Sequence, residues 1–582
     1  MKGFLNRLLK VAAYTVAGIV ILMAIAVGLF RLFLPRLPEY QDEIKTWASD
    51  AIGMQVEFTG MDARWGLRGP ELKFYGAELL RPEEGTRLIA AEEVGIGVSL
   101  IRLLQDRTLV VDTVTVSDTT VELRQVSDGS WLVQGAKPGN LLQASPADPG
   151  ALGSIDIIGD NIELQLIRPG DERPTFFNVS QLQVRRDESR ITADAAIRLP
   201  AEIGRDLDVA AIQLLAGDER TWNIQLEADD LDLLGLSDLI DHERYVFSSG
   251  TGDLELALAY ANERIVSVTA SVDFENLALG AGEAFSVDGR IDVNNDLDGW
   301  LVAADELLLS TASGDTPRAS IRLETSTDAD GEIVMLDARA TYFDLAHIGL
   351  AAAWFDDERR GLYDAYRPDG VLRDVEATIS DLDTEAPRFA AVATLDNLGL
   401  APHNDLPGMR GFSGHLRADH TSGLLEITSD YATLSVPQYL NDPIGVDAIN
   451  GTVIWRRSGQ RTTILSDSIE IRNSVLESES NIEIIIDGEA SPVVDLASNW
   501  SITDIAAAKR YIPESIVKPK LYNWFQDALV SGQIPRGRTQ INGPLEKFPF
   551  DNDEGRMLTE ATASNTLMRY AKTFPAVRIR EV

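Results

Sequence analysis

Hydrophobic and polar positions alternate with a period of two over most of this chain. In a β-strand successive side chains point to opposite faces, so each alternating run predicts a strand with one apolar face and one wet face. The chain is therefore predicted to be mainly β. The clearest runs contain the alternating residues Ile162, Leu164 and Leu166; Leu254, Leu256 and Leu258; Val266, Val268, Ala270 and Val272; Ile469 and Ile471; and Ile482 and Ile484.

Asp-Gly pairs occur repeatedly in the strand-rich region. Such pairs tolerate positive φ and close tight hairpins, which join antiparallel strands. We therefore expect a mostly antiparallel sheet. The pairs are Asp128-Gly129, Asp288-Gly289, Asp298-Gly299, Asp330-Gly331 and Asp369-Gly370.

A strand-to-helix junction recurs weakly along the chain, at Asp232-Leu233, Asp344-Leu345 and Asp504-Ile505. Aspartate at these points fits the N-cap of a short helix, because its side chain can accept hydrogen bonds from the first free backbone amides. The spacing of the three junctions is unequal, so they do not define a strict repeat.

Two segments have the 3.6-residue periodicity of amphipathic helices. The first, around 43–52, either packs on the first strands or caps the membrane-proximal end of a sheet; periodicity alone does not separate these alternatives. The second lies near the end of the chain. Their apolar positions are Ile44, Trp47, Ala48, Ala51 and Ile52, before Gly53, and Leu521, Trp524, Phe525, Ala528 and Leu529, before Gly532.

An uncharged stretch at 11–30 stands near the start of the chain. About 20 apolar residues are needed for a helix to cross a bilayer, so we expect a transmembrane anchor over 11–34. Ala24-Ile25-Ala26 offers a signal-peptidase pattern, but the apolar character continues beyond it, which favours an uncleaved anchor. Lys2, Arg7 and Lys10 precede the stretch and predict a cytoplasmic N-terminus, with the rest of the chain outside the cytoplasm.

Composition excludes several classes of function. The formal charge of −39 argues against a nucleic-acid partner, because phosphate binding needs clustered Lys and Arg. The absence of cysteine removes disulfides, thiolate metal sites and cysteine nucleophiles. The length of 582 residues exceeds one ordinary core, so several domains or a repetitive architecture are expected.

No segment provides the side chains of an enzyme or of a metal site. His403, His415 and His420 lack an accompanying zinc motif. The acidic segment from Asn294 to Asp305 partly imitates a calcium loop, but its strand-like flanks favour a polar hairpin turn. We therefore predict no catalytic residues, no metal and no cofactor.

The apolar strand faces can be buried in two ways. Two sheets can pack face to face as a sandwich, or a curved open sheet can leave its apolar face as a long groove. A groove could shelter acyl chains, at about 0.8 kcal/mol for each buried CH₂. The predicted groove-lining residues are Ile162, Leu164, Leu166, Leu254, Leu256, Leu258, Val266, Val268 and Val272.

Scattered short motifs give the chain a family resemblance. After the anchor come Gly53-Met54-Gln55-Val56, Trp65 and Gly69-Pro70-Glu71-Leu72-Lys73-Phe74, and later Asp128-Gly129-Ser130-Trp131, Leu199-Pro200, Gly451-Thr452-Val453-Ile454-Trp455, Tyr511-Ile512-Pro513, Trp524, Gly543-Pro544-Leu545 and Phe548-Pro549-Phe550. In this order they resemble the AsmA-like family of Gram-negative envelope proteins, most closely its YhdP branch.

The resemblance implies an inner-membrane protein whose bulk lies in the periplasm and whose apolar β-groove carries phospholipid towards the outer membrane. Outer-membrane or periplasmic proteins are its expected partners besides phospholipid and the inner membrane. The alternative is a structural or regulatory envelope scaffold of closed β-sandwiches that binds protein partners.

The expected divisions of the chain follow from these patterns. YhdP-type proteins are longer, so the chain is expected to be a C-terminally truncated member, with an atypical tail of polar coil or helix over 557–582. The divisions are 1–10 cytoplasmic, 11–34 anchor, 35–137 helix and first groove segment, 138–150 loop or linker, 151–510 repetitive groove, 511–555 amphipathic helix and following strand, and 556–582 tail.

Overall fold

The structure is a computed structural model of the chain. It describes residues 39–581 except 53–54, 66–69, 81–86, 99–110, 127–129, 136–154, 171–172, 188, 216–220, 241–246, 262–263, 281, 296–298, 385, 404–405, 439, 441, 489, 515–516, 549, 551 and 572–574, together with positions 14, 17, 18, 21, 24, 25, 28 and 32.

The chain divides into two compact units. Unit 1 is Met1–Ile240 with Thr251–Val272, and unit 2 is Asp241–Gly250 with Asp273–Val582. The elements of unit 1 are α2 (Gln41–Ile52), β1 (Gln55–Glu57), β2 (Gly60–Trp65), β3 (Pro70–Leu80), β4 (Arg87–Val98), β5 (Val111–Gln125), β6 (Trp131–Val133), β7 (Ile155–Ile167), β8 (Thr175–Arg186), β9 (Arg190–Arg198), β10 (Asp206–Leu214), β11 (Thr221–Asp232) and α5 (Leu233–Ile240).

Two strands, β12 (Phe247–Ala261) and β13 (Arg264–Leu279), have residues in both units. Unit 2 continues with β14 (Phe285–Asn295), β15 (Trp300–Thr311), β16 (Gly314–Asp315), β17 (Ala319–Thr327), β18 (Ile333–Asp344), η2 (Leu345–Trp354), α6 (Asp357–Tyr366), β19 (Asp369–Ser380), β20 (Arg388–Leu400), β21 (Gly408–Asp419), β22 (Ser422–Asp430), β23 (Thr433–Ser435), β24 (Ile444–Gly445), β25 (Ala448–Ser458), β26 (Arg461–Arg472), β27 (Leu476–Asp487), β28 (Val493–Ile502), α7 (Ile505–Ala508), η3 (Lys509–Tyr511), α8 (Pro519–Ala528), β29 (Leu529–Pro544), η4 (Leu545–Lys547), β30 (Arg556–Met568) and β31 (Val577–Glu581).

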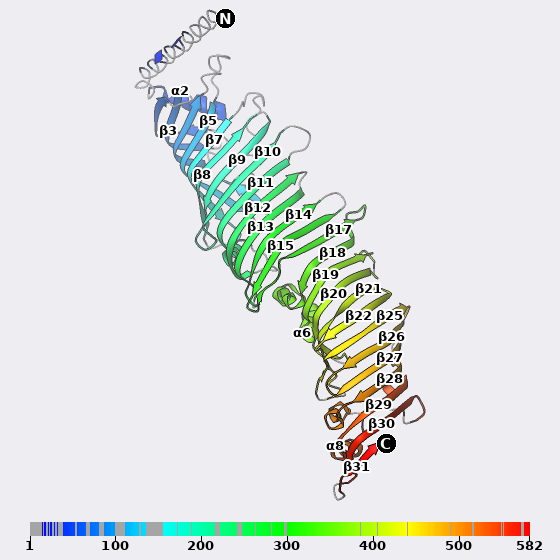
Figure 1. Cartoon of the computed structure of the whole chain (residues 1–582). Coiled ribbons are helices and arrows are strands. Elements are labelled where there is room, and N and C mark those ends of the chain that lie inside the picture. The colour runs from blue at the N-terminus through cyan, green and yellow to red at the C-terminus, as the bar shows by residue number, and fades with distance from the viewer. Residues whose placement is uncertain are drawn as a thin grey trace, which may run out of the picture. The chain divides into compact units, whose positions relative to one another are not determined.

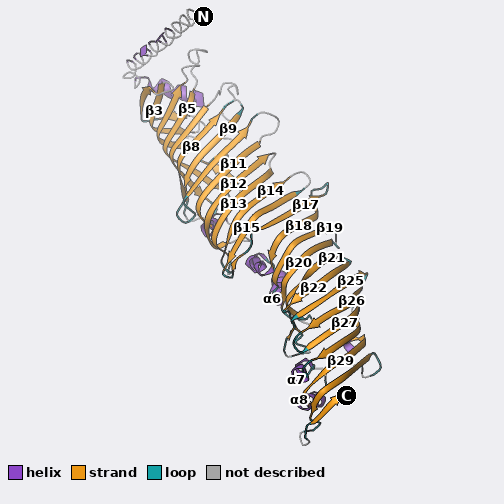
Figure 2. Cartoon of the chain, viewed as in Figure 1, coloured by secondary structure: helices purple, strands orange, loops and turns teal. Residues whose placement is uncertain are grey.

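The described strands form one open sheet of 31 strands, and only a few short helices accompany it (Figures 1 and 2). Nearly every printed strand pairing is antiparallel; β5 and β7 pair in parallel, through the register Val121 with Leu164. The predictions of a mainly β chain and of a mostly antiparallel sheet are confirmed. All five alternating runs lie within strands.

Helix α2 begins and ends close to the predicted limits, and α8 covers the predicted helix near the end of the chain. Ile44 of α2 packs against a buried cluster that includes Val56, Phe58 and Phe74. Packing on the first strands, one of the two roles considered for this helix, is therefore what the structure shows. Gly53 lies outside the described residues.

The three aspartates predicted as N-caps occupy those positions. Asp232 accepts hydrogen bonds from the backbone amides of Leu234 and Gly235 at 3.0 and 3.2 Å. Asp344 accepts one from Ala346 at 3.0 Å. Each cap satisfies an amide that has no partner within its own helix.

Asp504 likewise accepts a hydrogen bond from Ala506 at 2.9 Å. In unit 2, η2 and α7 follow β18 and β28. Eight successive antiparallel pairings separate these two strands, so they run in the same direction. Both helices therefore start on the same side of the sheet, where the C-terminal ends of β18 and β28 lie.

Several sequence-based expectations are wrong. Asp288-Gly289 lies inside β14, and Asp369-Gly370 begins β19, so neither pair closes a hairpin. Asp330-Gly331 does lie between β17 and β18. The coil or helix expected over 557–582 is replaced by β30 and β31, in which Thr566 pairs with Ile579.

Among the residues that the structure describes, no helix is both long and apolar enough to cross a bilayer. Most of the anchor predicted at 11–34, and all of the loop or linker predicted at 138–150, lie outside the described residues.

Candidate functional site: an apolar face on each unit

The register of unit 1 places uncharged residues in rows that run perpendicular to the strands. Directly paired residues lie on the same face of a sheet, so the printed pairings can be followed from strand to strand. One row crosses nine strands and links Ile162 with Leu254. It consists of Ala77, Ala91, Thr119, Ile162, Val179, Ile197, Leu207, Ala228 and Leu254.

The same register brings together the predicted lining residues of β7 and β12. Leu226 of β11 pairs with Leu256, and Ile224 pairs with Leu258. We call the resulting surface the apolar face of unit 1. Between β7 and β12 it contains Ile157, Ile162, Leu164, Leu166, Phe177, Val179, Leu182, Val184, Ala193, Ala195, Ile197, Leu207, Val209, Ala211, Ile224, Leu226, Ala228, Leu254, Leu256 and Leu258.

The opposite face of the same strands is polar. Glu227 pairs with Glu255, and Gln225 pairs with Ala257. These residues alternate with the apolar ones along the chain and lie on the opposite face of the sheet. Glu255 and Ala257 are exposed, whereas Leu256 is half-buried. The polarity and the burial of the two faces therefore agree.

Val266, Val268 and Val272 are half-buried in β13, as are the residues Ser267 and Thr269 between them. Burial does not distinguish the two faces of this strand segment. These three valines are accordingly not assigned to the apolar face, and their lining role stays a prediction.

Most residues of the apolar face remain partly accessible. Leu254, Leu256 and Leu258 are half-buried. The accessible surface of the chain is 36871 Å². A compact protein of 63.6 kDa would expose about 20,000 Å². The sheet thus keeps much of the area that a sandwich would bury.

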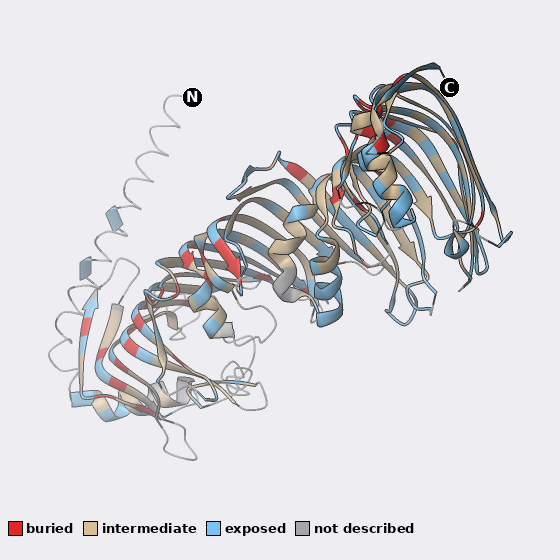
Figure 3. Ribbon diagram, turned by 90° about the horizontal axis from the view of Figure 1, so that it is seen from below, coloured by how far each residue is buried: buried red, intermediate tan, exposed pale blue. Residues whose placement is uncertain are grey.

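The strands are bowed rather than flat (Figure 3). The residues of the nine-strand row include several that are nearly buried, such as Ala91 at 5%, Thr119 at 4% and Ala228 at 4% exposure. In a single-layer sheet, a buried row between half-buried rows indicates a crease that bends toward that face. The apolar face of unit 1 is therefore the inner side of this bend.

Residues with a left-handed backbone lie beside the crease, together with β-bulges in β8 and β11. Asp118, Asn161 and Asp230 have φ of 51°, 52° and 51°, the left-handed conformation that Asn and Asp adopt more readily than most residues. Asn161 donates a hydrogen bond to Asp118 at 2.6 Å and accepts one from Asn178 at 3.0 Å. Bulges bend strands and increase their twist, so these residues account for the crease.

A phase shift in the alternation marks these bulges in the sequence. In β7, the apolar positions Ile155 and Ile157 are odd-numbered, and Ile162 and Leu164 are even-numbered. The shift occurs at Asp160-Asn161, where Asn161 takes the left-handed conformation while β7 keeps its register with β5 and β8. Sequence reasoning did not use this signal.

Unit 2 has an uncharged row of its own. It crosses thirteen strands at positions that the register pairs directly, and we call its side of the sheet the apolar face of unit 2. The row consists of Val293, Val302, Leu323, Ala338, Ala377, Ala391, Ala418, Gly423, Trp455, Ile464, Ile484, Val494 and Gly543.

Comparison with known proteins gives a family for this chain. The sequence profile of the YhdP protein family matches residues 1–582. The chain belongs to the YhdP family. The intermembrane phospholipid transporter YhdP of Escherichia coli (strain K12) is 21% identical, over 98% of this chain and 46% of its own length. The chain thus spans about half the length of that curated relative. No solved structure matches.

Membership of the YhdP family confirms the resemblance drawn from the short motifs. Catalytic residues were not predicted for this chain, and the rows described above contain no charged side chain. What the rows offer is a continuous non-directional contact surface for hydrocarbon.

Proposed function

We propose that this chain carries phospholipid along its apolar faces, as an inner-membrane-anchored bridge-like protein whose bulk lies in the periplasm and whose transport is directed towards the outer membrane. The observation that supports this most is the uncharged row that crosses the strands of each unit. A lipid tail lying along such a row meets equivalent contacts at every step, so it can slide without a deep energy minimum at any one strand.

Energetics favour acyl chains as the occupant. Each CH₂ transferred from water onto an apolar surface gains up to about 0.8 kcal/mol, and half-buried leucines such as Leu256 retain accessible area for that contact. The phosphate headgroup can remain in water. The name of the E. coli relative, an intermembrane phospholipid transporter, is consistent with this cargo.

The proposal assigns neither an enzymatic step nor a cofactor. Outer-membrane or periplasmic proteins are proposed partners at the ends of the path. The rival scaffold of closed sandwiches lacks support from the described residues, since their strands form one open sheet.

Site-specific photo-crosslinking tests the proposal. A benzophenone amino acid is placed in the full chain at Leu226 or Leu256, on the apolar face, and as matched controls at Gln225 or Ala257, on the opposite face of the same two strands. After irradiation in the cell envelope, phospholipid adducts are identified by mass spectrometry. Adducts are expected only from Leu226 and Leu256. Equal adducts from both faces, or none from either, would refute the proposal.

A further inference from the structure

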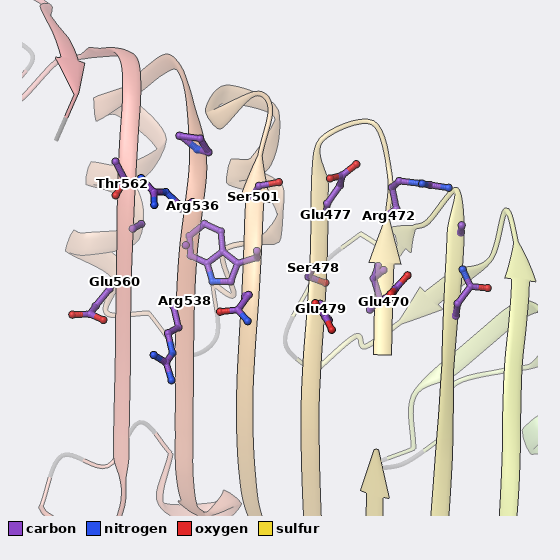
Figure 4. Close-up of a pocket in the computed structure, with 18 residues that line it drawn as sticks. Glu470, Arg472, Glu477, Ser478, Glu479, Ser501, Arg536, Arg538, Glu560 and Thr562 are labelled. Atoms are coloured by element: carbon purple, nitrogen blue, oxygen red, sulfur yellow. The ribbon is translucent and has the colours of Figure 1, made fainter. Parts of the chain in front are cut away.

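A second feature of unit 2 lies on the face opposite its apolar row. A depression of about 800 Å³ lies over β25 to β30 (Figure 4). Its lining is dominated by charged and hydrogen-bonding side chains. These are Asn450, Glu470, Arg472, Glu477, Glu479, Asn499, Ser501, Arg536, Arg538, Glu560 and Thr562.

The register shows that these side chains share the polar face. Directly paired positions form a row of Asn450, Glu470, Glu479, Asn499, Arg538 and Glu560. Ser480 and Ile482 alternate with members of this row along β27 and point to the other face. Figure 4 shows the labelled side chains of the depression projecting from neighbouring strands.

The charges in this depression are arranged for pairing but do not pair with one another. Arg472 lies directly opposite Glu477, and Arg538 directly opposite Glu560. In the described part of the chain no ion pair joins either couple, although such pairs form elsewhere, as between Arg373 and Asp396 at 3.1 Å.

Like charges also face each other without a cation between them. Glu470 lies directly opposite Glu479, an arrangement that destabilises a sheet. Glu479 accepts only a hydrogen bond from Ser468 at 3.3 Å. With Arg472, Glu477 and Glu560 included, the depression has a net positive end over β29 and β30, at Arg536 and Arg538, and a net negative end over β26 and β27, at Glu470 and Glu479.

We infer that this depression binds a zwitterion that carries a phosphate and a primary ammonium group. Arg536 and Arg538 lie two residues apart on one face of β29, beside the hydroxyl of Thr562 and the amide of Asn499. Guanidinium groups match phosphate oxygens geometrically, and this set supplies more donors than the two oxygens of a carboxylate can accept.

The ammonium group of the ligand would bind at the opposite end of the depression, at Glu470 and Glu479. The backbones of β27 and β29 are two strand spacings apart, about 10 Å, and Glu479 and Arg538 lie in one row on either side of Asn499. The two charged groups of the ligand are thus joined by a linker of a few bonds. Since the charged side chains Glu479, Arg536 and Arg538 are exposed on this face, we take the ligand to be the water-soluble form rather than an intact lipid.

Isothermal titration of the purified full chain tests this inference. The probe is phosphoethanolamine, with inorganic phosphate and ethanolamine as single-charge controls. We expect phosphoethanolamine to bind at least about tenfold more tightly than either, and Arg538→Gln and Glu479→Gln each to weaken binding about tenfold or more, as loss of one charged hydrogen bond implies.

Two matched controls lie on the same face outside the depression. Arg456→Gln and Glu483→Gln remove one charge of each sign from β25 and β27 and leave affinity unchanged. The inference is overturned if phosphoethanolamine does not bind, binds no better than phosphate, or is equally affected by the control substitutions. Binding to phosphatidylethanolamine nanodiscs but not to phosphoethanolamine would overturn the assignment to a soluble ligand. The photo-crosslinking at Leu226 tests only the proposed transport of lipid, so a failure there is distinguishable from a failure of the titration.

Discussion

Two carboxylates placed across one cross-section of the apolar face should block lipid passage. Leu226 and Leu256 are directly paired in β11 and β12, so Leu226→Asp with Leu256→Asp puts both charges in one row. Gln225 and Ala257 are paired in the same strands on the polar face. Gln225→Asp with Ala257→Asp is therefore the matched control. It adds two aspartates at the same cross-section, and they face each other across the strands as the first pair does.

The expected effect on passage is large. The altered pair replaces apolar contact over roughly three to five methylenes of a passing tail, at about 0.8 kcal/mol each. The barrier thus rises by about 2.4 to 4 kcal/mol, which slows passage roughly 50- to 900-fold. Replacing the half-buried leucines also lowers the free energy of unfolding somewhat. The control substitutions at Gln225 and Ala257 leave the apolar row unchanged.

The assay follows isotope-labelled phospholipid past the altered cross-section. A benzophenone at Leu164 reports on the apolar face of unit 1 before β11, and one at Val302 reports on the apolar face of unit 2. In the unaltered chain, label reaches both positions. In the Leu226 and Leu256 variant, one position should lose its label, whereas the Gln225 and Ala257 variant should behave as the unaltered chain. Equal sensitivity of the two variants, with circular dichroism unchanged, would refute transport along the apolar face.

Other predictions test the fold that supports this face. Asn161→Val places a β-branched residue at φ 52°. It should reduce local stability by about 1–2 kcal/mol relative to Asn161→Gly, as measured by hydrogen exchange of β7 and β8. Equal protection in the two variants would contradict the role of Asn161 in bending the strand. Gly235→Ala would set a Cβ 1.7 Å from the Glu202 carbonyl oxygen, so hydrogen exchange in α5 should increase. Gly361→Ala in α6, where a Cβ meets nothing within 4 Å, is the matched control and should not increase exchange in its helix. Hydrogen bonds from Ser189 lower the pKa of Asp187 to about 2. The ionised carboxylate therefore stabilises the β8–β9 hairpin above about pH 4. Protection of this hairpin from hydrogen exchange should fall as the pH decreases from 4 to 2, and Asp187→Asn should remove that pH dependence.

The alternation of side chains predicted many of the strands, including those that contain the five clearest alternating runs. It succeeded because a period of two fixes which side chains share a face. It also identified Asp232, Asp344 and Asp504 as N-caps, since helix capping depends on local hydrogen bonds. What it could not determine was which strands pair, and hence whether Ile162 and Leu254 lie on one surface.

Turn chemistry was a poorer guide. Asp288-Gly289 has a hairpin signature, yet it lies within β14 next to a register shift. A glycine can equally serve a bulge or a close approach between strands, as Gly289 does: a Cβ there would lie 3.1 Å from the Cα of Leu307. The strands at 556–568 and 577–581 were missed because their apolar positions do not alternate regularly.

The bulges connect the local sequence to the proposed transport. A regular strand keeps all its apolar side chains in one plane of the pleat, and a flat single layer would leave them exposed to water. The left-handed residue Asn161 in β7 and the bulge at Asp230 in β11 bend these strands toward their apolar side. The bend shields the row of Ile162 and Ala228 without a second layer to seal it. An open layer that bends toward its apolar side satisfies both requirements of a sliding contact, which are partial exclusion of water and access for a tail along the row.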